Sequence, residues 1–284
     1  MNKQNVLNRI FSRNMIRQCM DHKPCRTYVR AVEKYVENPE KKSNGQILND
    51  IYIRLNKTYR NEYFYKNTLL NKLLLGVHSI NTTTALSELP IANSKADFLL
   101  INGKAVVYEI KTELDNLDRL ESQIDDYYKA FDHVAVITCD DHVNALQERI
   151  KLMKKPVGIY VLSKRGTIKT VRKPEEYRTS LNQEVLFKIL RKPEYEHILL
   201  NYFSELPAVS EFKYYTECKN KFCEIAIDKA YLEVLAALKG RAKVIEKEFR
   251  KVPYELKSLV YFMNFQQVEY RKLEDFLKQS YGGE

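Results

Sequence analysis

The stretch Ala105–Tyr128, AVVYEIKTELDNLDRLESQIDDYY, decides the fold class because it joins an apolar strand to an amphipathic helix. Its first residues are β-branched, aromatic and apolar, which is typical of a strand buried on both faces. Glu109 and Lys111 stand two residues apart in that strand, so both charges project from one face. An ion taken out of water without a partner costs several kcal/mol or changes its protonation state. Something is therefore expected to hold the two groups there.

A second strand precedes this one and forms a hairpin with it. The segments ADFLLI and KAVVYEIK flank Asn102-Gly103, which is the strongest short hairpin signal. If Asn102-Gly103 were a strict two-residue loop, Asp97 would face Tyr108 and would lie on the opposite side of the sheet from Glu109. A three-residue loop or a bulge restores the parity and brings Asp97 nearly opposite Glu109. We predict one of these two arrangements.

The surrounding pattern predicts an α/β core. Helical spacing covers 46–75 with a break near Asn56, strands are indicated at 78–86, 96–101, 104–111 and 133–139, and a helix capped by Asp115 lies between the last two strands. In chain order these elements read α-β-β-β-α-β. A helix at 141–153 and a strand at 157–162 follow, and the pattern from Pro174 onward is helical.

Charge is unevenly distributed along the 284 residues, whose net charge is +10. The middle of the chain is acidic and both flanks are basic. An acidic site that collects a divalent cation between surfaces that attract phosphate gives this distribution, and so does simple solvation of exposed helices. We expect three parts, namely a basic helical segment at 1–58, the α/β core at 59–165 and a helical domain at 166–284.

The composition argues against a membrane protein and against a zinc protein. No window approaches the roughly 18 apolar residues of a membrane span, and the first residues lack the apolar core of a secretory signal. The five cysteines have no paired short spacings, and no histidine lies near Cys218 or Cys223 to complete a zinc site. We therefore expect a soluble protein of the reducing cytoplasm, without a membrane partner.

The polar residues of the hairpin suit metal-assisted hydrolysis of a phosphodiester. This chemistry needs carboxylates that hold Mg²⁺ or Mn²⁺ and a lysine that positions water and offsets charge on the phosphate. Asp97, Glu109 and Lys111 offer these groups, and Gln123 and Tyr127 follow one helical turn apart. Each pattern alone has a plain structural explanation, since exposed edge strands alternate charges and Tyr127 also fits the apolar stripe of its helix. Found together in this order, they favour a site.

Asp97, the sequence EIK at 109–111 and QIDDY at 123–127 resemble the PD-(D/E)xK nuclease superfamily. QIDDY is similar to the QxxxY motif of its RecB-type branch, and residues from about 60 to 140 also resemble a little-characterised bacterial family assigned to the superfamily. Ala96 departs from the proline in the superfamily's name. The resemblance implies a restriction-endonuclease-like core with a mixed central sheet. It also implies that Asp97 and Glu109 hold Mg²⁺ (or Mn²⁺), that Lys111 is the catalytic lysine, and that Gln123 and Tyr127 line the site.

A third carboxylate is expected upstream of the hairpin. Glu62 lies on the helical stripe of Tyr65 and Leu69, so its helix could aim it into the site. Glu88, which lies just before the second strand, is the alternative. We favour Glu62 because helical spacing gives it a reason to face inward.

These residues lead us to expect a metal-dependent nuclease of a bacterium or phage, acting on DNA more than on RNA. The exposed faces of the N-terminal helices carry Arg9, Arg13 and Arg17, which we predict to bind the nucleic-acid backbone. Two other functions stay open. One is a catalytically inactive nucleic-acid-binding module with the same fold, and the other is a helical interaction scaffold.

Overall fold

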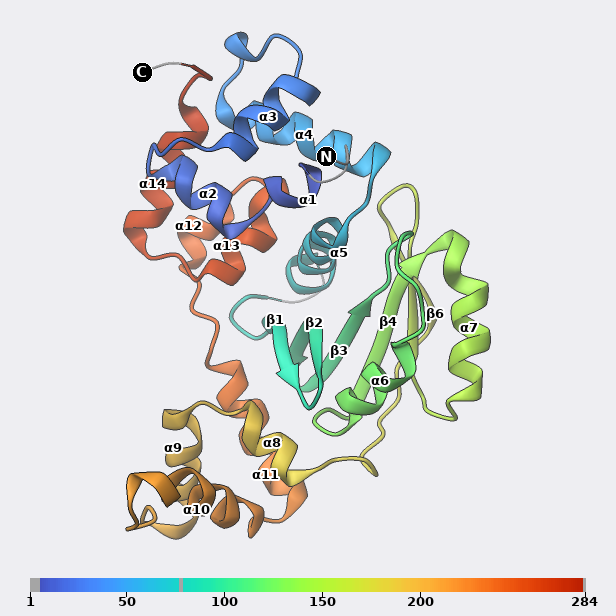
Figure 1. Cartoon of the computed structure of the whole chain (residues 1–284), viewed down its shortest axis with the longest axis vertical. Coiled ribbons are helices and arrows are strands. Elements are labelled where there is room, and N and C mark those ends of the chain that lie inside the picture. The colour runs from blue at the N-terminus through green and yellow to red at the C-terminus, as the bar shows by residue number, and fades with distance from the viewer. Residues whose placement is uncertain (1–5, 77–78, 283–284) are drawn as a thin grey trace. The chain divides into compact units, whose positions relative to one another are not determined.

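A computed structural model describes residues 6–76 and 79–282, and its contacts divide the chain into two compact units (Figure 1). The first unit comprises Met1–Ile80 with Ala242–Glu284, and the second comprises Asn81–Arg241. The three consecutive domains expected from the sequence are thus grouped differently. The two ends of the chain pack together, and much of the expected C-terminal domain belongs with the sheet.

The first unit is helical. Its α-helices are α1 (Leu7–Ile10), α2 (Arg13–Met20), α3 (Arg26–Tyr35), α4 (Asn44–Thr58), α5 (Glu62–Leu69), α12 (Glu246–Lys251), α13 (Lys257–Met263) and α14 (Gln267–Lys278). Shorter turns are the 3-10 helices η2 (Pro39–Lys41) and η5 (Tyr254–Leu256) and the π-helix η3 (Leu70–Leu75). The break predicted near Asn56 falls three residues later, because α4 continues to Thr58 and Asn61 caps α5 by accepting a hydrogen bond from Phe64 N.

Buried amides join the two chain ends within the first unit. The Tyr28 hydroxyl donates to Asn44 Oδ1 at 2.6 Å, and Asn44 Nδ2 donates to the Phe276 carbonyl at 3.0 Å. Asn67 acts in the same way, since its Nδ2 donates to the Tyr254 carbonyl at 3.0 Å and its Oδ1 accepts from Ser258 N at 2.9 Å. Buried polar groups are costly unless paired, so these bonds require the C-terminal helices to pack here.

The second unit is built on a six-stranded sheet with the order β1-β2-β3-β4-β5-β6. Its strands are β1 (Thr84–Ile91), β2 (Ser94–Asn102), β3 (Lys104–Ile110), β4 (His133–Cys139), β5 (Gly158–Leu162) and β6 (Ile168–Arg172). The pairs β3–β4 and β4–β5 are parallel and the other three are antiparallel, so the α/β class and the mixed sheet are confirmed.

Two strands differ from the sequence expectation. The strand expected at 78–86 begins only at Thr84, and residue 78 lies outside the described residues. β1 extends to Ile91 rather than ending at 86, because the tight turn at Ala92 and Asn93 pairs Ile91 with Ser94. β6 was not expected at all. It is an exposed edge strand whose cations interrupt the apolar alternation that identifies strands.

Helices connect the strands and follow the sheet. They are α6 (Leu120–Tyr128), η4 (Asp140–His142), α7 (Val143–Leu152), α8 (Gln183–Ile189), α9 (Lys192–Phe203), α10 (Glu211–Cys223) and α11 (Ile227–Lys239). Asp115 does not cap α6, as the sequence suggested. Its carboxylate instead accepts hydrogen bonds from Thr112 N at 2.8 Å and Thr112 Oγ1 at 2.7 Å, which closes a turn directly after β3.

One apolar core joins a face of the sheet to these helices. Val107 of β3, Val136 of β4 and Ile159 of β5 share it with residues of α6, α7, α8 and α11. Side chains alternate along a strand, so Glu109 lies two residues beyond Val107 on this same face. The core thus ends where the charged residues begin.

Two general expectations can be compared with the described residues. No helix among them combines the length and the apolarity that a membrane crossing requires. All five cysteines are free thiols.

Candidate active site

The β2–β3 hairpin places Asp97 opposite Glu109. Ile101 pairs with Ala105, and the three residues between them form the loop, in which Asn102 stands opposite Lys104 and Gly103 has a φ of 69°. This register continues to the pair Phe98–Tyr108, and one further step sets Asp97 against Glu109. The predicted three-residue loop is therefore confirmed. Asp97 Oδ2 accepts a hydrogen bond from Ile110 N at 2.8 Å, so a side chain takes the place of the ladder bond.

Four of the predicted residues form one connected network. The Tyr127 hydroxyl donates to Glu109 Oε2 at 2.5 Å, and Lys111 Nζ lies 2.9 Å from Glu109 Oε1. The same ammonium donates to Gln123 Oε1 at 2.9 Å. Glu109 and Lys111 come from β3, while Gln123 and Tyr127 come from one face of α6. The sheet and the helix thus converge on a single carboxylate.

The network is nearly closed to solvent. The Glu109 side chain is 2% exposed and that of Lys111 is 9% exposed. Burial and the neighbouring Glu109 carboxylate raise the pKa of Tyr127 well above its usual value, so the phenol keeps its proton and donates a hydrogen bond to Glu109. The question raised by two charges on a buried strand thus has a structural answer, because each charge is paired with the other.

The backbone of this strand end is fixed by β4. Lys111 N donates to the Ile137 carbonyl at 2.9 Å, and Thr138 Oγ1 donates to the Lys111 carbonyl at 2.9 Å. Both neighbours belong to a fully buried strand. The side chains of the network therefore stand on a rigid support, as preorganised sites require.

An open hollow of about 690 Å³ lies beside the network. Asp97 and Gln123 line it together with residues of the β1–β2 turn and of α6 that the sequence did not single out, namely Ala92, Asn93, Ser94, Lys95, Arg119, Ser122, Asp125, Asp126 and Lys129. The hollow is therefore polar and carries both signs of charge. It adjoins Gln123, whose oxygen is already held by Lys111.

Asp126 ties the wall of this hollow together. Its carboxylate accepts hydrogen bonds from Ser94 Oγ at 2.7 Å, Asn93 N at 3.2 Å and Lys129 Nζ at 2.7 Å. Burial acts to raise the pKa of Asp126, but these hydrogen bonds outweigh it and hold the pKa below its usual value. Its helical spacing from Gln123 was the signal that could have identified it, since residues three apart share a helix face.

Glu88 offers a third carboxylate within the second unit. Ser87 pairs with Phe98 and Leu89 with Ala96, so Glu88 stands opposite Asp97, and their carboxylate oxygens lie within 4.8 Å of each other. Glu88 has a φ of 58° inside a strand, a conformation that non-glycine residues rarely adopt and that tends to occur at functional sites. Its side chain forms an ion pair with Lys95.

The remaining predicted residues belong to the first unit. Glu62 is the first residue of α5, is half exposed and pairs with Lys66 Nζ at 2.5 Å. Arg9 in α1 and Arg13 and Arg17 in α2 are exposed, and Arg17 Nη2 lies 4.0 Å from Glu269 Oε1. The second unit therefore brings together Asp97, Glu109, Lys111, Gln123 and Tyr127. The roles of Glu62 and of the three arginines stay predictions.

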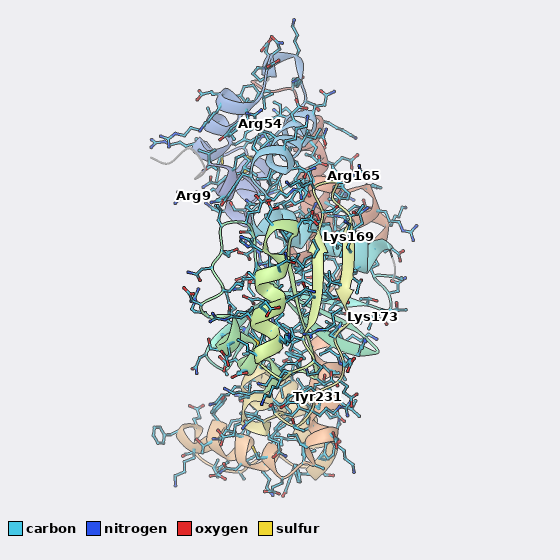
Figure 2. All side chains as sticks on the ribbon, turned by 90° about the vertical axis from the view of Figure 1, so that its right-hand side faces the viewer. Arg9, Arg54, Arg165, Lys169, Lys173 and Tyr231 are labelled. Carbon is cyan, nitrogen blue, oxygen red and sulfur yellow. The ribbon has the colours of Figure 1, made fainter. Side chains whose placement is uncertain are left out.

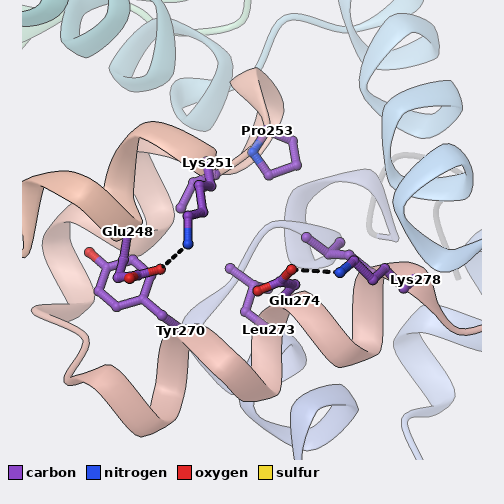
Figure 3. Close-up of a pocket in the computed structure, with 9 residues that line it drawn as sticks. Glu248, Lys251, Pro253, Tyr270, Leu273, Glu274 and Lys278 are labelled. Carbon is purple, nitrogen blue, oxygen red and sulfur yellow. Dashed lines mark hydrogen bonds and ion pairs between the residues drawn. The ribbon is translucent and has the colours of Figure 1, made fainter.

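The first unit has a cavity of its own, about 230 Å³ in volume, between α12 and α14 (Figure 3). Val252, Leu273 and Leu277 give it apolar walls. The charged groups beside it are paired, since Lys251 donates to Glu248 at 2.8 Å and Lys278 donates to Glu274 at 2.6 Å. This cavity therefore lacks the converging hydrogen-bond network that marks the site in the second unit.

Comparison with known proteins assigns a family. Residues 55–260 match the family described as bacteriophage P4 protein cII, and this range covers most of the chain. The chain belongs to the bacteriophage P4 protein cII family. Protein cII of Enterobacteria phage P4 is 24% identical over 133 residues, which cover 46% of this chain and 39% of that protein. The matched segment is therefore less than half of the phage protein. No solved structure matches the chain.

The P4 cII family match has a clear relation to the site. The matched range includes the whole sheet, the four residues of the network and Asp97. It also includes Glu62 and Glu88. Arg9, Arg13 and Arg17 precede the matched range. The site thus belongs to the part of the chain that carries the P4 cII family likeness, and the predicted arginines do not.

Proposed function

We propose that this chain is a metal-dependent nuclease that hydrolyses phosphodiester bonds, with DNA as the substrate and a restriction-endonuclease-like core of the PD-(D/E)xK superfamily. The grouping of Asp97, Glu109, Lys111, Gln123 and Tyr127 at the end of one hairpin carries this proposal. These five residues follow the order of the superfamily's motif, and their side chains lie together at the end of β3, which supports the proposal. A chance set of exposed charges would not be expected to converge on one buried carboxylate.

The donor set fits Mg²⁺ or Mn²⁺. Asp97, Glu109 and Glu88 offer carboxylate oxygens, the hard ligands that these ions prefer. Both oxygens of Glu109 accept one contact each, from Lys111 and Tyr127, and a carboxylate oxygen has room for a second. A bound ion would polarise the phosphate and lower the pKa of a water molecule.

Lys111 would stabilise the charge that develops on the phosphate. Two of its contacts, to Glu109 and Gln123, fix the ammonium in place. An ammonium has three protons, so one donor is left for a water molecule or a phosphate oxygen. A donor held in advance costs no reorganisation when the reaction occurs.

Gln123 and Tyr127 would have different roles beside Lys111. The oxygen of Gln123 accepts from Lys111, so its amide NH₂ is the end left to donate to a phosphate in the adjoining hollow. Tyr127 holds the orientation of Glu109 through its 2.5 Å hydrogen bond. Gln123 is therefore a substrate contact in this proposal and Tyr127 a positioning residue.

The test is cleavage by the full chain. Plasmid, linear DNA, single-stranded DNA and RNA are incubated with Mg²⁺, with Mn²⁺ or with EDTA. We expect cleavage with the ions alone, lost in Lys111→Ala and kept in Lys188→Ala, which removes an exposed lysine of α8. If the folded protein binds these nucleic acids but cleaves none, it is the inactive binding module, and if it ignores them at modest salt, it is an interaction scaffold.

A further inference from the structure

The hairpin that joins β5 to β6 is strongly basic. Its sequence, SKRGTIKTVRK at 163–173, contains Lys164, Arg165, Lys169, Arg172 and Lys173 and no acidic residue. All five cations are exposed. Figure 2 shows Arg165, Lys169 and Lys173 one below another along this hairpin, which we call the basic hairpin.

The tip of the basic hairpin has a fixed conformation. Gly166 N donates to the Ser163 carbonyl at 2.9 Å, and Ser163 N donates to the Thr167 carbonyl at 2.9 Å. Gly166 has a φ of 76°, which glycine adopts without strain. This tight turn sets Lys164 and Arg165 at its two central positions, so little backbone entropy would be lost when they bind a ligand.

Three cations of the basic hairpin have their charge uncompensated within the unit. Arg172 Nε donates to the Val157 carbonyl at 2.7 Å, so this guanidinium has a structural contact. Arg165, Lys169 and Lys173 form no ion pair with any residue in the described part of the chain. A cluster of like charges without counterions attracts an anionic partner.

The sheet register relates the basic hairpin to the candidate active site. The pair Ile110–Ile137 extends by one step to Lys111 and Thr138 of β4, Thr138 pairs with Val161 of β5, and Val161 pairs with Lys169 of β6. Paired residues share a face of a sheet, so Lys111 and Lys169 point to the same side. They are three strands apart, which at the usual strand spacing is about 14 Å.

The topology also sets the tip of the hairpin at the same edge of the sheet as the site. β3, β4 and β5 are parallel, and Glu109 and Lys111 stand at the carboxyl end of β3. The turn with Arg165 follows the carboxyl end of β5. In open α/β sheets, ligands bind outside the carboxyl ends of the strands. Asp140 and Asp141 follow β4, which lies between β3 with Lys111 and β5 with the turn. Because these two carboxylates repel phosphate, a nucleic-acid backbone would contact Lys111 on one side of them and the basic hairpin on the other.

We propose that the basic hairpin binds the sugar–phosphate backbone of the nucleic acid whose scissile phosphate lies at Lys111. The spacing of about 14 Å corresponds to about four base pairs along a duplex. Because it takes nucleic acid as the ligand, this inference rests on the proposed function. Edge strands often carry lysines that prevent strand pairing, which explains Lys169 but not the cations in the turn or after the strand.

The test counts phosphate contacts in EDTA, where no metal-dependent cleavage occurs. Binding of a short fluorescein-labelled DNA duplex is measured by anisotropy over a series of salt concentrations. We expect the triple variant Arg165→Gln, Lys169→Gln, Lys173→Gln to bind about tenfold more weakly or worse at moderate salt, with a slope of log K against log salt that is about 2 to 3 smaller in magnitude. The single variant Arg165→Gln should reduce the magnitude of this slope by about 1.

A matched control shows whether the position of the removed charges matters or only their number. The triple variant Lys188→Gln, Lys213→Gln, Lys229→Gln removes the same charge from exposed positions of α8, α10 and α11 in the same unit, and should bind as the wild type does. An unchanged slope in the hairpin variant, or an equal loss in the control, overturns the inference. If the hairpin variant binds weakly while the wild type cleaves nothing, only the nuclease proposal fails.

Discussion

The Tyr127 hydroxyl donates a 2.5 Å hydrogen bond to Glu109 Oε2, although the two residues are 18 positions apart in α6 and β3. The bond fixes the orientation of a carboxylate that is 2% exposed. Tyr128, the next residue of α6, is buried as deeply as Tyr127, but its hydroxyl has no hydrogen-bond partner among the described residues. Two adjacent tyrosines of one helix thus differ in a way that can be measured.

Tyr127→Phe should destabilise the protein and Tyr128→Phe should not. The first change leaves a buried carboxylate oxygen with one partner fewer, which costs about 1–3 kcal/mol. The second removes a hydroxyl that makes no bond, so the free energy of unfolding should stay the same or rise. Urea unfolding of both variants without metal measures the difference. Equal effects of the two changes would mean that the Glu109 contact contributes nothing.

Much of the core could be predicted from the sequence because local rules and tertiary packing agree there. The alternation around Asn102-Gly103 predicted the hairpin, and the need to bring Asp97 and Glu109 onto one face predicted its three-residue loop. The charged pair on a buried strand predicted a partner, which is the ion pair of Glu109 with Lys111. In each case the constraint lies within a few residues of sequence.

The rest depends on contacts between distant segments. The grouping of the two chain ends rests on buried amides such as Asn67, whose partners Tyr254 and Ser258 lie far along the chain. β6 lacks the apolar alternation of a strand because it lies at an exposed edge. Glu88 adopts a positive φ that no local pattern predicts. Sequence periodicity carries no information on such features.

The predicted arginines of α1 and α2 should affect binding and leave chemistry intact. Reversing the charge at Arg9, Arg13 and Arg17 should weaken DNA binding and reduce its salt dependence, because exposed cations of this kind contact the backbone. Cleavage at saturating DNA should persist. Anisotropy and a cleavage assay measure the two effects. The same reversal at Arg30, Arg54 and Lys57, also exposed in the first unit, is the control, and an equal effect there would contradict a specific surface.

Lys257 makes the stability of the protein depend on pH. Burial lowers the pKa of Lys257 to about 8 from 10.5, while its ammonium donates to the Phe249 carbonyl at 2.6 Å. Between these values the unfolded chain binds more protons than the folded one, so the contribution of Lys257 to stability rises as pH increases. Lys257→Met removes the penalty of burying the charge. Its gain over the wild type should therefore be larger at pH 7 than at pH 10, measured by urea unfolding, and a constant difference would refute this.

The third carboxylate can be identified by comparing Glu88 with Glu62. The sequence favoured Glu62, and within the second unit a carboxylate oxygen of Glu88 also lies within 4.8 Å of one of Asp97. An amide is a poorer ligand for a hard cation than a carboxylate. Glu88→Gln should therefore raise the Mn²⁺ concentration needed for half-maximal cleavage, and the same measurement on Glu62→Gln shows whether Glu62 is a ligand as well. A rise in Glu62→Gln alone would assign the role to Glu62, and two unchanged variants would leave only Asp97 and Glu109 as ligands.

The buried pair of Glu109 with Lys111 distinguishes a metal site from a structural ion pair. Lys111→Ala leaves Glu109 buried without its counter-charge, and breaking such a pair costs about 3–5 kcal/mol. If Glu109 is a metal ligand, Mg²⁺ replaces the lost positive charge, so it should restore much of the stability of Lys111→Ala. Cleavage should stay about 100-fold lower or worse, because the ion does not replace a donor aimed at the phosphate.

The comparison with Glu109→Gln completes this test. That variant removes the negative charge, so Mg²⁺ should neither bind tightly nor raise its melting temperature. Thermal unfolding of both variants with and without Mg²⁺, followed by isothermal titration of the ion, gives the result. If Mg²⁺ stabilises neither Lys111→Ala nor the wild type, then Glu109 and Lys111 serve only to satisfy each other inside the fold, and the metal-dependent mechanism is wrong.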